Sequence, residues 1–123
     1  MSRAERQAAE RRGRLGETLA ALLLRLKLYR ILGRRVRTPM GEIDLIALSP
    51  SGLLCFVEVK TRGDDRTAVE SLKAPQRARI ARAAALYVAS RPWLAEKGVR
   101  FDVVSLGARR VPRHLRDAWR MGE

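Results

Sequence analysis

Cysteine, aromatic residues and long apolar runs are all scarce in this chain of 123 residues. The single cysteine, Cys55, excludes a framework of intrachain disulfides and fits a reducing compartment. Aromatic residues make up 5% of the chain and are scattered, so no stacking platform for single-stranded nucleic acid is predicted. The longest apolar run, around residues 19–24, ends at Arg25 and is too short to cross a bilayer. We therefore expect no membrane partner.

The first residues do not have the pattern of a targeting segment. They are rich in arginine, but Glu5, Glu10 and Glu17 argue against a transit peptide, and no apolar signal-peptide core is present. The expected location is therefore cytoplasmic, associated with the nucleoid at most.

Acidic residues are half as numerous as basic ones, with 13 Asp and Glu against 26 Lys and Arg, which gives a net charge of +13. Such a surplus on a small domain is the usual electrostatic footprint of a nucleic-acid partner. An arginine-rich, high-GC genome and attraction to anionic lipid are the alternatives. Charge alone favours nucleic acid.

The length and an apolar content of 46% predict one folded domain with its own core. We expect it to cover residues 13–123, preceded at 1–12 by a basic segment that forms a frayed helix or a mobile arm, because Gly13 and Gly16 weaken a continuous helix.

Hydrophobic periodicity predicts two long helices and four strands. The expected ranges are a helix at 14–28, strands at 31–38, 42–48 and 53–61, a helix at 71–89, a strand at 99–106 and a short terminal helix at 112–121. The long helix before the fourth strand predicts that this strand runs parallel to 53–61. The expected fold class is therefore α/β, with an αβββαβ core in which helices flank a mixed sheet.

Charged residues interrupt two strands that are otherwise apolar, and they form the main site candidate. Asp44 lies in the strand at 42–48, while Glu58 and Lys60 share one face of the strand at 53–61. If Ser49 pairs with Leu53 across the turn, Asp44 lies opposite Glu58 with Cβ atoms roughly 5 Å apart. Two carboxylates at that distance repel each other unless a cation lies between them, and Mg²⁺ suits such a pair. Lys60 would stand beside the ion.

Other polar residues have simpler interpretations. Cys55 alternates to the face opposite Glu58 and is expected to be a packed core thiol. For Asp102 we expect a structural role, such as pairing with a nearby arginine. Asp64 and Asp65 are expected to cap or turn a loop rather than to bind a metal.

Residues on the two helices leave alternatives open. Glu17 heads a second apolar stripe and points into a site, or it is a first-turn glutamate that favours the helix dipole. Lys73 and Arg77 lie on the same side of their helix as Ile80, where they reach phosphates near the site or remain solvated.

Four stretches together resemble a known superfamily. They are Gly16-Glu17, Gly41-Glu42-Ile43-Asp44-Leu45-Ile46-Ala47, Phe56-Val57-Glu58-Val59-Lys60-Thr61-Arg62 and Arg100-Phe101-Asp102-Val103-Val104. With the αβββαβ order, this constellation resembles the restriction-endonuclease-like, PD-(D/E)XK superfamily. The closer resemblance is to the bacterial YraN family (UPF0102), which is similar to archaeal Holliday-junction resolvases.

The resemblance implies a role for each matching residue. Asp44 and Glu58 would be metal carboxylates, the Val59 carbonyl a further oxygen ligand, Lys60 the catalytic lysine and Glu17 the helix-borne acid of the resolvase-like branch. The implied cofactor is Mg²⁺ or Mn²⁺. The implied partner is DNA, held by its backbone, for which the candidate residues are Arg35, Arg37, Arg62, Lys73 and Arg77. Because resolvases act on two strands, a homodimer is also an arrangement to consider.

Two positions depart from the family pattern. Leu28 stands before Tyr29 where the family usually has glycine, and Arg35 stands where the first strand usually has asparagine. Neither residue belongs to the implied metal site, so substrate contacts are where a difference is expected.

Three interpretations remain at this point. The first is a metal-dependent DNA endonuclease, with branched or damaged DNA as substrate by analogy. The second is a nucleic-acid-binding module without catalysis, a partner of a repair or recombination protein. The third is structural: Asp44 and Glu58 are each paired with an arginine, which would lower the pKa of both carboxyls.

Overall fold

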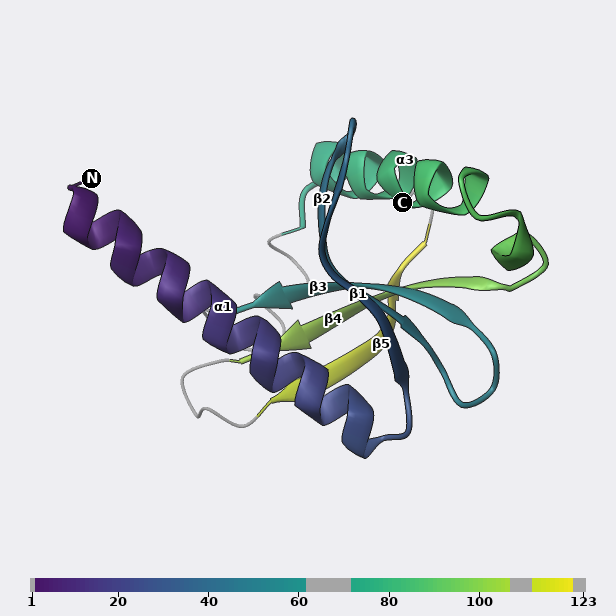
Figure 1. Ribbon diagram of the computed structural model, residues 1–123, viewed down its shortest axis with the longest axis horizontal. Coiled ribbons are helices and arrows are strands. Elements are labelled where there is room, and N and C mark those ends of the chain that lie inside the picture. Colours follow the sequence, from purple (N-terminus) through teal and green to yellow (C-terminus); the bar gives the residue numbers. More distant parts are fainter. Residues whose placement is uncertain (1, 62–71, 107–111, 121–123) are drawn as a thin grey trace.

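A mixed sheet with a helix on each face forms the protein, and a computed structural model describes it for residues 2–61, 72–106 and 112–120 (Figure 1). The elements are α1 (Arg3–Leu26), β1 (Arg30–Thr38), β2 (Gly41–Leu48), β3 (Leu54–Lys60), α3 (Ala74–Ala89), η1 (Pro92–Leu94), β4 (Val99–Ser105) and β5 (Arg113–Trp119). The predicted α/β class is thus confirmed, as is the αβββαβ order, to which β5 adds a further strand.

The sheet has the strand order β1-β2-β3-β4-β5. The first three strands form an antiparallel meander, and the turn between β2 and β3 is closed by the Ser49 amide, which donates to the Leu53 carbonyl at 2.8 Å. The chain then crosses over through α3, so that β4 pairs parallel with β3, as predicted. The fifth strand returns antiparallel to β4.

Alternation along β3 divides the core into two layers. Leu54 and Phe56 belong to the layer under α3, while Cys55 and Val57 belong to the layer under α1. The Cys55 side chain is fully buried, and burial raises the pKa of its thiol to about 11. The prediction of a packed core thiol is therefore confirmed.

Helix α1 is longer than predicted. It begins at Arg3, where the Ser2 hydroxyl accepts the Glu5 amide at 3.1 Å as an N-cap, and it passes through both glycines to Leu26. The predicted start at Arg14 was wrong because the arginine and glutamate residues before it favour a helix more than the glycines oppose it. The N-terminal half of α1 projects away from the sheet (Figure 1). The division into an arm and a domain at residue 12 stays a prediction.

The predicted terminal helix at 112–121 was wrong, because residues 113–119 form β5. A buried carboxylate organises this strand: Asp102 of β4 hydrogen-bonds His114 Nε2 at 2.6 Å and accepts the Asp117 amide at 3.0 Å. The rings of Phe101 and Trp119 stack across the same pair of strands with centroids 4.1 Å apart. Pairing between strands therefore overrides the local helical pattern.

The structural role predicted for Asp102 is confirmed. Its fully buried carboxylate accepts two hydrogen bonds of 2.8 Å from the Arg100 guanidinium. Burial would raise the pKa of Asp102, but the hydrogen bonds from His114 and Arg100 outweigh burial and lower that pKa below its usual value.

Helix α3 starts at Ala74 with Pro75 in its first turn, and residue 71, where the sequence predicted the start, lies outside the described residues. Within the described ranges, no helix is both long and apolar enough to span a bilayer.

Candidate metal centre

Carboxylates from three elements meet near the carboxyl end of β3. The β2–β3 register runs from the pair Leu48 and Leu54 to the pair Leu45 and Val57, so Asp44 and Glu58 lie just beyond the last pair, and their direct opposition stays a prediction. One Asp44 oxygen accepts the Val59 amide at 2.8 Å. This bond turns the Asp44 carboxylate toward β3.

Glu58 is the carboxyl of the site whose pKa departs most from its ordinary value. It is only 7% exposed, and its Oε1 atom is buried without a hydrogen-bond partner in the described part of the chain. Burial, together with the charge of Asp44, raises the pKa of Glu58 to about 8. Burial also raises the pKa of Asp44, even though the Val59 amide bond acts in the opposite direction. The charge of Asp44 thus destabilises the ionised form of Glu58, while the charges of Glu17 and Glu42 destabilise that of Asp44.

These shifts contradict the structural interpretation, which expected an arginine beside each carboxylate and a lowered pKa for both. Among the described residues, no ion pair joins either Asp44 or Glu58 to an arginine. It is Glu17, 6% exposed on α1, whose carboxylate is paired with an arginine, through Nε of Arg35.

Glu17 and Asp44 lie close to a third acid that the sequence analysis did not single out. Glu17, Glu42 and Asp44 each offer one oxygen, and these oxygens lie within 4.8 Å of one another. The signal for Glu42 was present, since it precedes Asp44 by two residues and side chains two apart share a strand face. Glu42 also lies 3.8 Å from the Arg37 guanidinium.

This donor set fits a hard divalent cation. All the candidate side-chain ligands are carboxylates, which Mg²⁺ and Mn²⁺ prefer, and one buried oxygen of Glu58 has no partner in the part of the chain that the structure describes. A cation would offset the mutual repulsion of Asp44 and Glu58. The Arg35 guanidinium already provides one positive charge at Glu17 and would compete there.

Lys60 is half-buried at the end of β3, and its charge lowers the pKa of both Asp44 and Glu58 against the larger effect of burial. The main chain fixes this strand end, because the Lys60 carbonyl accepts the Leu106 amide at 2.8 Å. The roles given to Lys60 and to the Val59 carbonyl stay predictions.

The residues predicted to contact DNA lie on two elements. On β1, Arg35 pairs with Glu17, and Arg37 has a side chain that is 91% exposed. At the start of α3, Lys73 is the exposed N-cap, and Arg77 donates to the Leu72 carbonyl at 2.6 Å. The remaining candidate, Arg62, lies outside the described residues, as do Asp64 and Asp65.

A basic residue of α3 reaches the site from the other side. A Cβ atom built on Gly41 would come within 2.2 Å of Arg79 Nη1, so this guanidinium lies against the start of β2. The charge of Arg79 also lowers the pKa of Glu58. Gly41 has a φ of 122°, which a side chain rarely adopts.

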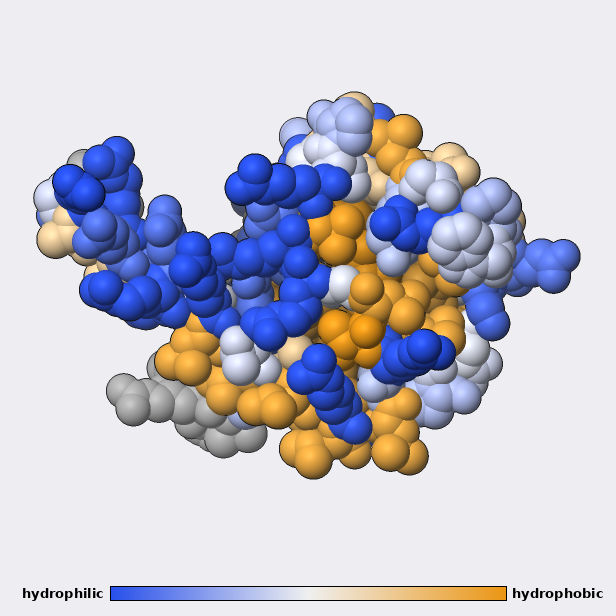
Figure 2. All heavy atoms as spheres, viewed as in Figure 1, coloured by the Kyte–Doolittle hydropathy of each residue, from blue (hydrophilic) through white to orange (hydrophobic). Residues whose placement is uncertain are grey.

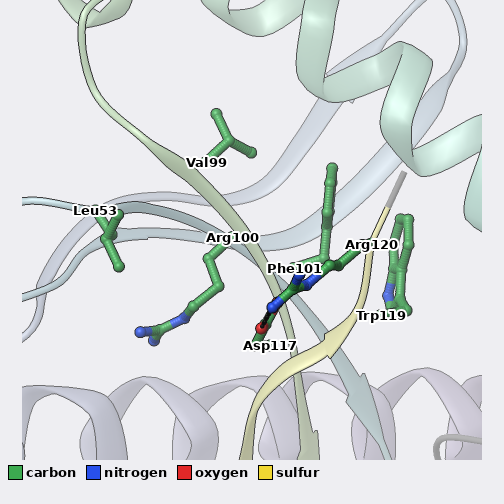
Figure 3. A pocket seen from close by; sticks show the side chains of 7 residues that line it. All are labelled: Leu53, Val99, Arg100, Phe101, Asp117, Trp119 and Arg120. Atoms are coloured by element: carbon green, nitrogen blue, oxygen red, sulfur yellow. Dashed lines mark hydrogen bonds and ion pairs between the residues drawn. The ribbon is translucent and has the colours of Figure 1, made fainter. Parts of the chain in front are cut away.

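A separate hollow of about 400 Å³ lies at the opposite end of β4 from these carboxylates (Figure 3). It is lined by Leu53, Val99, Arg100, Phe101, Asp117, Trp119 and Arg120. None of the candidate ligands of the metal centre contributes to it.

Comparison with known proteins matches residues 16–106 to the model of "Uncharacterised protein family UPF0102". The chain belongs to the UPF0102 family. A relative from Paramagnetospirillum magneticum, "UPF0102 protein amb4503", is 52% identical over 119 residues, which cover 94% of this chain and 92% of the relative. UPF0102 proteins from Parvibaculum lavamentivorans and Caulobacter sp. are 51% and 48% identical, over 92% and 91% of this chain and 84% and 80% of their own lengths.

Both departures from the UPF0102 pattern fall at left-handed backbone positions. Leu28 has a φ of 69° and Arg35 a φ of 49°. Glycine and asparagine, which the family pattern leads one to expect there, are the residues that adopt this conformation most readily. The pattern is therefore explained by the backbone at both positions, and Arg35 adds an ion pair to Glu17 that asparagine would not form.

Proposed function

We propose that this protein is a metal-dependent endonuclease that hydrolyses phosphodiester bonds in DNA. The observation that carries the proposal is the buried carboxylate of Glu58, which lies beside Asp44 and has one oxygen without a partner among the described residues, with Lys60 two residues away on the same strand face. A binding surface for nucleic acid needs basic residues, but it does not need a buried carboxyl whose pKa is raised by burial and by a second carboxylate beside it.

Asp44 and Glu58 would hold Mg²⁺ or Mn²⁺, with Glu17 and Glu42, which cluster with Asp44, as further carboxylates nearby. When bound, such a cation polarises a phosphoryl oxygen and lowers the pKa of water. Lys60, next to both carboxylates, would orient the attacking water or stabilise the charge that develops on the phosphate.

The net charge of the chain supports DNA as the substrate. A net charge of +13 attracts the DNA backbone, and exposed basic groups on β1 and at the start of α3 would hold it without reading bases. Branched or damaged DNA is the substrate class proposed by analogy with resolvases. The same charge supports the second candidate, a non-catalytic binding protein of repair or recombination.

The test is cleavage of labelled DNA by the purified full chain in Mg²⁺ or Mn²⁺, with Glu58→Ala and Lys60→Ala in parallel. The panel holds duplex, single-stranded, flap and four-way-junction DNA, and binding is measured separately in EDTA. We expect metal-dependent cleavage that both variants lose, while their DNA affinity stays close to that of the wild type.

Glu96→Ala is the matched control, since Glu96 is an exposed acid in the turn after η1. It should cleave like the wild type. Cleavage that persists in well-folded Glu58→Ala and Lys60→Ala would refute the proposed site. Binding to DNA without cleavage in either metal would favour the non-catalytic binding protein.

A further inference from the structure

Helix α1 presents a row of leucines to solvent on the side turned away from the sheet. Leu15, Leu19, Leu22 and Leu26, here named the α1 seam, are 60%, 39%, 48% and 82% exposed. The buried residues of the same helix form its other side, namely Gly16, Glu17, Ala20, Ala21 and Leu24. In Figure 2, apolar side chains gather along the C-terminal half of α1, whereas the projecting N-terminal half is hydrophilic. An exposed apolar row of this kind usually marks an interaction site.

The spacing of the α1 seam indicates the shape of its partner. The leucines are separated by four, three and four residues, which is the alternation of the a and d positions in a heptad repeat. A stripe limited to a and d positions is narrow, and it suits the side of a second helix rather than a broad apolar surface. A membrane surface would instead be matched by a wide apolar face.

One flank of the α1 seam carries a row of positive charges. Arg11, Thr18 and Arg25 are spaced by seven residues and therefore lie along the same edge of the helix. Arg34 of β1 donates to the Thr18 hydroxyl at 2.7 Å, so its guanidinium fills the place between the two helical arginines. Arg11, Arg25 and Arg34 are all exposed.

This charge argues against a second copy of the chain as the occupant. Two copies would each bring the same arginine row and a net charge of +13 to the contact. A helix with acidic residues at its own flanking positions would instead place opposite charges against Arg11, Arg34 and Arg25.

We propose that the α1 seam is the docking site for an acidic amphipathic helix of a partner protein. Apolar residues at heptad spacing in that helix would pack on the four leucines, and its glutamates or aspartates would face the arginine row. The inference is independent of the proposed nuclease activity, because the seam lies on the side of α1 opposite Glu17.

The probe is a synthetic peptide of about three heptads with leucine at a and d and glutamate at e and g, whose like charges prevent it from pairing with itself. Its affinity for the full chain is measured by titration calorimetry. We expect binding that weakens at least tenfold for the double variant Leu19→Gln, Leu22→Gln, which keeps the charge of the protein. Because both leucines are exposed, these substitutions leave the core intact, and circular dichroism checks this.

A second peptide with the same glutamates but alanine at a and d separates packing from charge. It should bind at least tenfold more weakly than the leucine peptide, and Arg11→Gln, Arg25→Gln should weaken binding of the leucine peptide and reduce its salt dependence. The DNA affinity of the leucine double variant should equal that of the wild type.

Any of four results would overturn the inference. Equal binding of the two peptides, or of the leucine peptide to wild type and to the double variant, would show attraction by charge alone. A wild-type dimer in sedimentation equilibrium that the double variant dissociates would assign the seam to a second copy. Leucine-dependent binding to vesicles containing phosphatidylglycerol would assign it to a membrane surface.

Discussion

At the scale of single residues, the end of α1 shows how backbone geometry selects a side chain. The Tyr29 amide donates to the Leu24 carbonyl and the Leu28 amide to the Arg25 carbonyl, both at 2.9 Å. These are the two bonds of a Schellman motif, in which the residue at the Leu28 position is usually glycine. Leu28 takes the left-handed conformation there and leaves its side chain 79% exposed. Its side chain therefore provides little packing in return for the unfavourable conformation.

Leu28→Gly should stabilise the protein by about 0.5–1 kcal/mol, because relief of the left-handed conformation outweighs the backbone entropy that glycine adds to the unfolded chain. Urea denaturation followed by circular dichroism measures the difference. The matched control is Leu26→Gly, which is 82% exposed but lies in the helix, and it should destabilise by about 0.5–1 kcal/mol. If both glycines destabilise equally, the strain assigned to Leu28 is wrong.

The buried carboxyl of Glu58 should make stability depend on pH. Its pKa of about 8 lies above the ordinary value of 4.5, so between these values the folded protein holds a proton that the unfolded chain has released. Stability should therefore fall as pH rises from 4.5 to 8. Glu58→Gln cannot ionise, and we expect it to be more stable than the wild type by about 2–4 kcal/mol at pH 8 and by little at pH 4.5.

Urea unfolding in EDTA at several pH values tests this expectation, with the exposed acid in Glu96→Gln as control. Parallel pH profiles for wild type and Glu58→Gln would contradict the assigned burial of Glu58. Addition of Mg²⁺ should stabilise the wild type but not Glu58→Gln, because a bound ion stabilises only the state that binds it.

At the scale of elements, the two glycines of α1 have opposite roles. A Cβ on Gly13 would meet only Arg35 Nη2 at 3.6 Å, an ordinary contact. A Cβ on Gly16 would come within 2.7 Å of Thr61 Cγ2 and 3.1 Å of Leu106 Cδ1, where the helix packs on the end of the sheet. Gly16 therefore allows the close approach that brings Glu17 to the carboxylates of β2.

Gly13→Ala should stabilise the protein by about 0.5–1 kcal/mol through helix propensity, whereas Gly16→Ala should destabilise it by about 1 kcal/mol, since overpacking outweighs the same gain. Thermal and urea denaturation of the two variants provide the comparison, and each serves as the control for the other. A stabilised Gly16→Ala protein would mean that α1 does not press on the sheet at this point.

The sequence predicted those elements whose local pattern agrees with their tertiary contacts. Apolar strands joined by Ser49-Pro50-Ser51-Gly52 predicted the β2–β3 hairpin and its register, which ends at the pair next to Asp44 and Glu58. The terminal strand was mistaken for a helix because its stability depends on Asp102, an acid of another strand. Such a contact leaves no periodic signal in the segment itself.

At the scale of the whole molecule, the candidate metal centre depends on convergence that no single segment encodes. Glu17 comes from the first helix, Glu42 and Asp44 from the second strand, and Glu58 from the third. The family resemblance supplied Glu17, whereas Glu42 was not singled out although it precedes Asp44 by two residues in the same strand. The chain has a net charge of +13, so the molecule combines an overall positive charge with a local acidic centre.

The net positive charge should give DNA binding a steep dependence on salt. With about six phosphate contacts, affinity for a duplex should fall about 10³-fold between 50 and 200 mM NaCl, because counterions released from the backbone drive binding. Fluorescence anisotropy of a labelled duplex in EDTA measures affinity without cleavage.

Arg37→Gln and Lys73→Gln, beside the acidic centre and at the start of α3, should each reduce the salt slope by about one. Lys97→Gln is the control, since Lys97 is exposed before β4, at the end of the parallel β3–β4 pair away from Lys60. If Lys97→Gln reduces the salt slope as much as the other two variants do, DNA is attracted by net charge and not by an oriented surface. An affinity that does not change with salt would exclude the proposed contacts to the DNA backbone.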